Sequence, residues 1–391
     1  MSAGIKSKGT LPKAECVKDK NNIGIGTMNQ KTILTILILV LAGIVTFLGG
    51  YLLANKGTGQ TANIAGLNRF SNFSANKPES EKTTTVKLNR LSSVKVVSPA
   101  ISENGRNINY FEKGTGKIFS SDFAGQSINI INGNIKEDVT GAVWSKNGWQ
   151  AVVARKTSRG QVFSLSDLKI DILTDLNEKM SGITWSPDGQ KIAYLFFDSS
   201  AEEGNISIAN PDGSSFKNVL PTRNSQLKIS WPSKDSLAFY SPSGVDRSLF
   251  LLNMETGELE KILESANNLK TLWSPDGLNL IYSHSKEDGS VVTNLLQLKE
   301  DNRSVLDLSL QTNADKCVWS LNSQKFYCGG TKADGAEEGL YEFDLTKKEF
   351  GLVFQSSSVD QIEIEKPFLS PVENFIFFTN GYDQYLFSIS L

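Results

Sequence analysis

A repeated aspartate is the first residue of this chain whose type and spacing could do chemistry. Asp188 and Asp276 both stand in the phrase Trp-Ser-Pro-Asp-Gly. A carboxylate at such a position could hold calcium or transfer a proton. The neighbouring proline and glycine instead favour a tight turn, in which aspartate bonds its own backbone. We interpret both aspartates as turn residues.

The single histidine offers little further chemistry. His284 cannot form a multi-histidine metal site, and with no evident acid partner it is a weak general base. The chain has no glycine-rich phosphate loop, Gly-x-Ser-x-Gly elbow or Ser-x-Asp-x-Gly box. We therefore predict no catalytic residue, no metal site and no cofactor. Carboxylates from different repeats could still meet in space, which leaves an enzyme as the alternative.

Cys317 and Cys328 are candidates for a disulfide. They lie on either side of the turn that follows Trp319. Alignment with the turn centred between Asp188 and Gly189 places the two cysteines opposite each other on adjacent antiparallel strands. Facing residues lie about 4.5–5.5 Å apart at Cα, within disulfide reach. We favour a disulfide, which persists outside the cytoplasm, and two buried thiols are the alternative.

These residues belong to a phrase that recurs along the chain. Its copies begin at Ile101, Trp144, Trp185, Trp231, Trp273, Trp319 and Leu369. They are spaced 41 to 50 residues apart, and each has a short apolar run before the turn and another after it. This period and the strand–turn–strand pattern predict an all-β fold, a seven-bladed β-propeller of four-stranded blades.

The residues that the copies of the phrase share indicate structural roles. Proline presets φ for the turn, and Asp-Gly supplies its positive-φ position. The indoles are expected in the gaps between neighbouring blades, where sheets pack about 10 Å apart. The structural residues of the repeat are therefore Trp144, Trp185, Asp188, Gly189, Trp231, Trp273, Asp276, Gly277 and Trp319.

The phrase at this period resembles the TolB-type propeller repeat, a WD-repeat-like module of bacterial envelope proteins. The resemblance covers roughly residues 85–391 and is clearest in the copies at Trp185 and Trp273. It implies a propeller fold and an extracytoplasmic compartment. TolB has six blades behind an α/β domain, whereas this chain shows seven repeats and no such domain. The resemblance therefore does not carry over TolB's partner.

The last repeat ends one strand short at Leu391. An unpaired sheet edge would be a liability. A spare strand precedes the first repeat, around residues 85–89. We predict that it supplies the outer strand of blade seven and closes the ring.

An apolar segment precedes the repeats. Residues 33–54 carry no charge, and 22 residues at about 1.5 Å each span a hydrocarbon core of about 30 Å. We favour an uncleaved signal anchor, a single transmembrane helix over 32–54; a cleaved signal peptide is the alternative. Six lysines before the segment place the N-terminus in the cytoplasm and the propeller outside, in a single-pass protein of the cytoplasmic membrane. Met28 is an alternative start that keeps this orientation.

These boundaries define four parts. Residues 1–31 form a basic cytoplasmic tail in which Cys16 should stay reduced, 32–54 the membrane helix, 55–83 a flexible polar linker, and 84–391 the propeller. The tail carries a net charge of +4, which leaves −6 for the rest of the chain. A mildly acidic outer domain argues against nucleic acid as a partner.

Function should reside in the loops after each second strand and before each first strand, which gather at one end of the ring. These loops are mixed in charge and poor in aromatic residues, which favours a protein or peptide partner over sugar stacking. The candidate residues are Arg159, Asp198, Glu202, Glu203, Arg247, Lys286, Asp288, Lys332, Asp334, Tyr382 and Asp383. We hypothesise a membrane-tethered binding scaffold of the cell envelope. The alternative is an extracytoplasmic hydrolase or lyase, which a tight carboxylate cluster at the channel mouth would favour.

Overall fold

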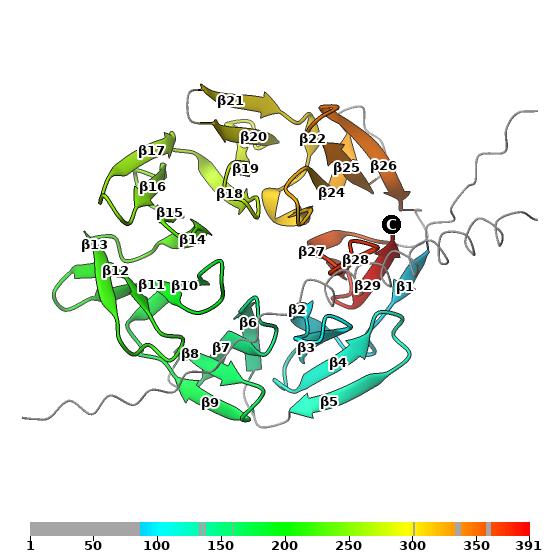
Figure 1. Ribbon diagram of the computed structural model, residues 1–391, viewed down its shortest axis with the longest axis horizontal. Helices are drawn as coiled ribbons and strands as arrows, with labels where there is room; N and C mark the ends of the chain where they lie inside the picture. The colour runs from blue at the N-terminus through cyan, green and yellow to red at the C-terminus, as the bar shows by residue number, and fades with distance from the viewer. Residues whose placement is uncertain are drawn as a thin grey trace, which may run out of the picture. The chain divides into compact units, whose positions relative to one another are not determined.

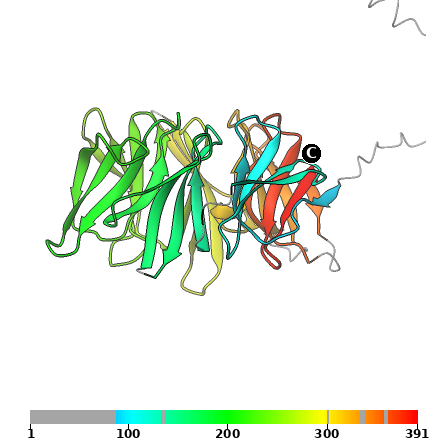
Figure 2. The same ribbon diagram turned by 90° about the horizontal axis from the view of Figure 1, so that it is seen from below.

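Each repeat folds into one antiparallel sheet, and the sheets close a ring (Figure 1). The computed structural model describes residues 87–391, apart from 133–134, 136–137, 159, 300–301, 333–337 and 357–360. Seen edge-on, the strands run between the two ends of the ring (Figure 2). The prediction of a seven-bladed propeller of four-stranded blades is confirmed for this part of the chain.

The first four blades follow the chain in order, from the innermost strand outward. Blade one consists of β2 (Val96–Ile101), β3 (Asn107–Glu112), β4 (Ile118–Asp122) and β5 (Ile128–Asn132). Blade two consists of β6 (Asp138–Trp144), β7 (Gln150–Thr157), β8 (Gly160–Asp167) and β9 (Ile172–Asp175). Blade three consists of β10 (Met180–Trp185), β11 (Ile192–Asp198), β12 (Glu203–Ala209) and β13 (Lys217–Thr222). Blade four consists of β14 (Lys228–Ser233), β15 (Ser236–Tyr240), β16 (Leu249–Asn253) and β17 (Leu259–Leu263).

The last three blades include the irregular ones. Blade five consists of β18 (Asn267–Trp273), β19 (Asn279–Ser285), β20 (Val291–Lys299) and β21 (Asn302–Asp307). Blade six consists of β22 (Leu310–Gln311), the 3-10 helix η1 (Ala314–Lys316), β23 (Cys317–Trp319), β24 (Lys325–Lys332), β25 (Gly339–Asp344) and β26 (Glu349–Gln355). Blade seven consists of β27 (Ile364–Leu369), β28 (Phe375–Asn380), β29 (Leu386–Ser390) and β1 (Leu88–Arg90).

Blade seven therefore takes its outer strand from the start of the described chain. β1 pairs antiparallel with β29, with Leu88 opposite Ile389 and Arg90 opposite Phe387. The predicted closure by a strand around residues 85–89 is confirmed. This pairing joins the first described strand to the last and covers the edge that β29 would otherwise expose.

The repeat phrase builds the turn between the first two strands. In blade three, Asp188 Oδ1 accepts hydrogen bonds from Ser186 Oγ at 2.6 Å and from the Gln190 amide at 3.0 Å. The hydrogen bond from Ser186 holds the pKa of Asp188 below its ordinary value. Gly189 has a φ of 71°, and a Cβ there would lie 2.6 Å from Ser145 Oγ of blade two. The aspartate thus orders its own turn, and the glycine lets neighbouring blades approach.

The indoles lie between blades and tie some of them together. Trp185 Nε1 donates to the Val143 carbonyl of blade two at 2.7 Å, and Trp319 Nε1 donates to the Leu272 carbonyl of blade five at 3.2 Å. Trp144 makes the corresponding bond to Ser98 in blade one. In Trp231 and Trp273, Nε1 is buried with no hydrogen-bond partner among the described residues. The phrase therefore joins blades by hydrogen bonds as well as by packing.

The predicted tail (1–31), membrane helix (32–54) and linker (55–83) lie outside the described residues, as does the exact start of the propeller at 84. Between residues 87 and 391, as far as the structure describes them, no helix is long and apolar enough to cross a membrane. The boundaries of all four parts stay predictions.

Candidate functional site

Blade six departs from the regular repeat at its innermost strand. Gln311 of β22 pairs with Thr331, whereas Cys317 of β23 pairs with Cys328, both on β24. Residues 312–316 therefore stand opposite only two residues on β24, and η1 takes up the extra length. Those two residues are glycines. A Cβ on Gly329 would lie 2.5 Å from Ile364 Cβ, so a larger residue would push the innermost strand of blade seven away.

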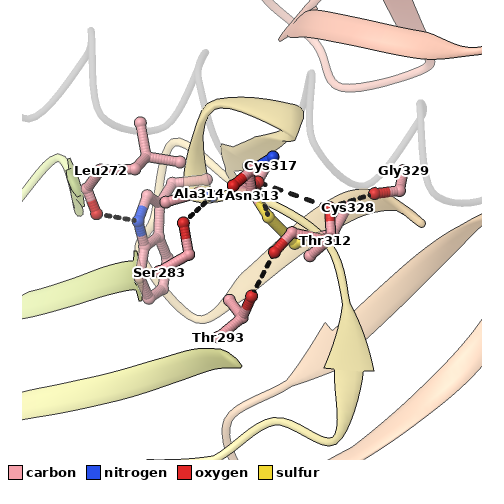
Figure 3. The surroundings of a disulfide bond; sticks show 10 residues. Leu272, Ser283, Thr293, Thr312, Asn313, Ala314, Cys317, Cys328 and Gly329 are labelled. Atoms are coloured by element: carbon pink, nitrogen blue, oxygen red, sulfur yellow. Dashed lines mark hydrogen bonds between the residues drawn. A yellow bond between two sulfur atoms is a disulfide. The ribbon is translucent and has the colours of Figure 1, made fainter. Parts of the chain in front are cut away.

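Buried contacts fix η1 against its neighbours (Figure 3). The Ala314 amide donates to Ser283 Oγ of blade five at 3.0 Å, and Thr293 Oγ1 donates to the Thr312 carbonyl. Thr312 Oγ1 in turn donates to the Gly329 carbonyl on β24. All these hydrogen bonds are buried, so η1 is held to both blade five and blade six.

A disulfide lies directly beside η1 in the same view (Figure 3). Cys317 and Cys328 face each other in the register of β23 and β24, with their Cα atoms 4.0 Å apart. Their sulfur atoms are joined at 2.02 Å, and both residues are buried. The bond therefore pins the C-terminal end of η1, where Lys316 precedes Cys317.

Lys316 is the centre of a charged group that joins blades six and seven. Its Nζ lies 2.7 Å from Glu363 Oε1, 3.3 Å from Glu365 Oε1 and 3.8 Å from Glu338 Oε1. Glu338 precedes β25, and the other two glutamates stand at the start of β27. We call these four residues the Lys316 cluster. The side chain of Lys316 is 15% exposed, so the charge is largely removed from water.

The cluster sets the protonation of its members. Burial opposes the charge on Lys316, but the hydrogen bond to Glu363 and the charges of the three glutamates outweigh it and raise the pKa of Lys316. Burial is the main cause that raises the pKa of Glu338, and Lys316 offsets only part of it. Oε1 of Glu338 is buried and accepts no hydrogen bond from the described residues. Lys316 is thus held protonated and is no nucleophile, whereas Glu338 is the group best placed to carry a proton.

Two cavities flank the cluster. A cavity of about 320 Å³ is lined by Lys316 and Glu338 together with Thr312 of blade six. Another, of about 530 Å³, is lined by Glu363 and Glu365 together with residues of blades one and two. Both cavities open among the loops that follow the second strand of each blade and precede the first strand. These loops lie at the end of the ring predicted to carry function, and we call this end the loop face. The cluster therefore forms part of the wall of two hollows on the loop face.

The structure distributes the predicted interaction residues over several loops of this face. Asp198 forms an ion pair with Lys179 at 2.7 Å. Lys286 and Asp288 line a separate cavity of about 670 Å³, beside His284. Tyr382 is 65% exposed. Glu202 and Glu203 are exposed at the start of β12, and Arg247 is half-buried before β16. Asp383 accepts a hydrogen bond from the Tyr385 amide, and Lys332 stands at the end of β24. The remaining two predicted residues, Arg159 and Asp334, lie outside the described residues.

Sequence reasoning did not single out the Lys316 cluster, although a signal was present. Lysines stand three residues before the phrase in four consecutive blades. They are Lys228, Lys270, Lys316 and Lys366. Only the fold shows that one of them meets three glutamates, one from its own blade and two from the next blade. Over the described residues, no group of three or more histidines, cysteines, aspartates or glutamates could hold a metal ion.

Comparison with known proteins relates the fold to others. No protein-family model and no curated protein matches the sequence. An oligogalacturonate lyase from Vibrio parahaemolyticus is 12% identical, with 79% of this chain and 94% of that one covered, at a TM-score of 0.58. The β-propeller domain of Cps50 (Swd1) from Myceliophteria thermophila is 12% identical, with 78% and 99% covered, at a TM-score of 0.55. TolB from Acinetobacter baumannii is 14% identical, with 76% and 78% covered, at a TM-score of 0.44, which is too low to carry an argument. At such identities the likeness shows the propeller fold alone, and the fold does not decide between an enzyme and a binding module.

Proposed function

We propose that this protein is a membrane-tethered, extracytoplasmic scaffold of the bacterial cell envelope that binds a protein or peptide on its loop face. The observation that carries the proposal is the Lys316 cluster with its two flanking cavities. Concave, partly charged loop surfaces on a rigid ring suit recognition, because a rigid scaffold positions the loops. The uncharged segment 33–54 supports the tether and the lysines before it support the orientation.

The charge of the cluster indicates the chemistry of the partner. Glu363 and Glu365 alone outnumber Lys316, so the blade six–seven junction has an excess of negative charge even when Glu338 carries a proton. Beside the smaller cavity, Glu338 Oε1 accepts no hydrogen bond from the residues that the structure describes. A basic side chain of a partner would complement this excess. We therefore infer a partner that presents lysine or arginine to this junction.

Site-specific photo-crosslinking in membranes tests the proposal. Tyr382 is exposed on the loop face beside Gly381, whose amide donates to the Glu363 carbonyl at 2.9 Å. A photoreactive residue at Tyr382 should give a discrete crosslinked band. The matched control is Leu278, which is 57% exposed in the turn at the opposite end of the ring. Equal crosslinking from both positions would contradict a loop-face partner.

A charge reversal separates the junction from the rest of the face. Glu365→Lys alters the cluster at a position whose side chain is 32% exposed. It should reduce crosslinking from Tyr382 at least fivefold if the partner is basic, with unchanged circular dichroism as the check on folding. Undiminished crosslinking would place the partner elsewhere on the loop face.

An extracytoplasmic hydrolase or lyase is the second candidate, because Glu338 has a raised pKa and lies beside a cavity. The propeller fold is shared with an oligogalacturonate lyase. Purified protein can be assayed on oligogalacturonate with manganese, since one such lyase is described in complex with manganese. Turnover that Glu338→Gln abolishes would support the enzyme, and no turnover would count against this substrate.

A further inference from the structure

A cavity on the flank of blade three is distinct from the loop-face site. It has a volume of about 290 Å³, and its lining includes Tyr194, Phe196 and Phe216. Tyr194 is buried in the apolar cluster that packs blade three against Leu165 of blade two, with Phe196 at the edge of that cluster. The cavity therefore lies along the face of blade three that is turned toward blade two.

The rest of the lining is mostly polar and carries no charge. It consists of Asn177, Asn205, Asn218, Ser207, Gly213 and the apolar Met180, and among the described residues no aspartate, glutamate, lysine, arginine or histidine lines the cavity. The cavities beside Lys316 and His284, in contrast, each contain charged side chains. A charged ligand would find no counter-charge here, and burying it unpaired would be costly.

The amides have hydrogen-bonding capacity to offer. Asn218 Oδ1 accepts a hydrogen bond from Ser207 Oγ at 2.9 Å, which orients its amide. Half-buried Asn205 lines the same cavity with its side-chain amide. A wholly apolar ligand would leave such groups desolvated and unpaired, at a cost of about 1–3 kcal/mol each. The occupant should therefore bring its own hydroxyl or amide groups.

Phe216 lines the cavity directly after a hydrogen-bonded hairpin turn. The side chain is 65% exposed, although a phenylalanine of this size favours burial. The hairpin before it is tied by the Gly213 amide, which donates to the Asn210 carbonyl at 2.9 Å, and by the Ser214 amide, which donates to Asp212 Oδ1 at 3.0 Å. An exposed aromatic residue on a fixed hairpin provides a flat surface against which a ligand can stack.

A ligand with apolar ring faces, a rim of neutral hydroxyls and no charge meets all these conditions. We propose that this cavity binds a neutral hexopyranose unit of a glycan, with the ring against the aromatic side chains and its hydroxyls on Asn205 and Asn218. The volume fits a single sugar ring, since sites of about 300 Å³ lie at the small end of ligand pockets. This binding is separate from the protein partner proposed for the loop face.

Titration calorimetry and saturation-transfer NMR on the full-length protein in detergent test the proposal. The probes are two neutral trisaccharides, maltotriose and tri-N-acetylchitotriose, and the charged trisaccharide trigalacturonate. At least one neutral probe should bind, and its ring protons should receive saturation. Trigalacturonate should bind at least tenfold more weakly. Absence of binding by both neutral probes, or equal binding of trigalacturonate, would overturn the proposal.

Two variants locate the binding. Phe216→Ala removes an exposed ring, and Asn205→Ala removes the amide; each should weaken binding at least fivefold without lowering Tm. Ile170→Ala is the matched control, because Ile170 is 63% exposed on the corresponding hairpin of blade two, outside the cavity. Binding that survives both cavity variants, or that Ile170→Ala weakens equally, would place the sugar elsewhere.

Discussion

At the scale of residues, one lysine, Lys316, links blades six and seven by ion pairs. Lys316 is largely buried, and its charge is balanced by glutamates of both blades. A lysine with a raised pKa contributes its full stabilisation below the unfolded value of about 10.4, and this is lost as pH rises through the folded value. The stabilisation that the charge of Lys316 provides should therefore be lost in strongly alkaline solution.

Glu338 should behave in the opposite way from an ordinary ion-pair carboxylate. Burial raises its pKa, so the folded state favours the protonated form, and its contribution falls as pH rises through the folded value. Glu338→Gln mimics the protonated acid, and we expect it to raise Tm at pH 7. The gain should disappear as pH falls toward about 4, where the parent side chain is also protonated. Calorimetric melts across this range measure the difference.

Glu363 supplies the matched control for that prediction. Its Oε1 accepts the short hydrogen bond from Lys316 Nζ at 2.7 Å. Glu363→Gln should therefore destabilise the protein at pH 7, by roughly 1.5 kcal/mol, the low end for a bond between charged groups. If the Gln variants at positions 338 and 363 shift Tm in the same direction, the assignment of protonation states within the cluster is wrong.

At the residue scale, the sequence predicts roles that depend on neighbours within one repeat but not contacts between blades. The turn role of Asp188 follows from its immediate neighbours, and the facing of Cys317 and Cys328 follows from the alignment of repeats. The Lys316 cluster could not be predicted in this way, because its members come from two blades and Lys316 lies in η1, which interrupts the regular innermost strand. The aromatic cavity could not be predicted for a similar reason, since Tyr194 lies on β11 and Phe216 lies in the connection before β13, and only the folded sheet brings them together.

The disulfide acts at the scale of one element, because it fixes η1. It closes a loop of separation 11, so its entropic contribution is modest, on the order of 3 kcal/mol or less. Mass spectrometry of non-reduced protein from membranes should show the Cys317–Cys328 link. Reduction should speed amide hydrogen exchange at residues 312–316 and leave the other blades protected. Two rapidly alkylated thiols in native protein would contradict an oxidised pair.

The outer strand of blade seven is the other element on which the ring depends. Deleting residues 84–91 removes β1 and exposes β29, and we expect aggregation or a Tm decrease of more than about 4 °C, which exceeds the effect of ~1 kcal/mol. A deletion of equal length within the predicted linker, residues 60–67, is the control. Equal melting of the two deletion variants would show that β1 does not stabilise the ring.

Elements were predictable where the repeat was regular and not where it changed. The terminal strand was foreseen because blade seven lacked one, and an unpaired edge demands a partner. The interruption of the innermost strand in blade six was not foreseen, since Trp273 and Trp319 are separated by 46 residues, the same as Trp185 and Trp231. Overall spacing does not show where within a repeat the extra residues fall.

At the scale of the whole molecule, our two proposals place two binding sites on different surfaces of the propeller. The loop face carries the charged junction for a basic protein partner, and the flank of blade three carries the uncharged cavity for a sugar. Both require the propeller to face outward, where an envelope partner and a glycan can reach it. Topology is thus the premise that both proposals share.

Protease treatment of spheroplasts tests this premise directly. The lysines before residues 33–54 predict that the N-terminus stays inside and that everything beyond about residue 55 is outside. With an epitope tag at the N-terminus, external protease should leave a small tagged fragment and remove the propeller. Detergent-lysed spheroplasts are the control, and there the tag should be lost as well. A propeller protected until lysis would reverse the orientation, whereas mature protein that begins near Asn55 would show that the segment is cleaved and the tether absent.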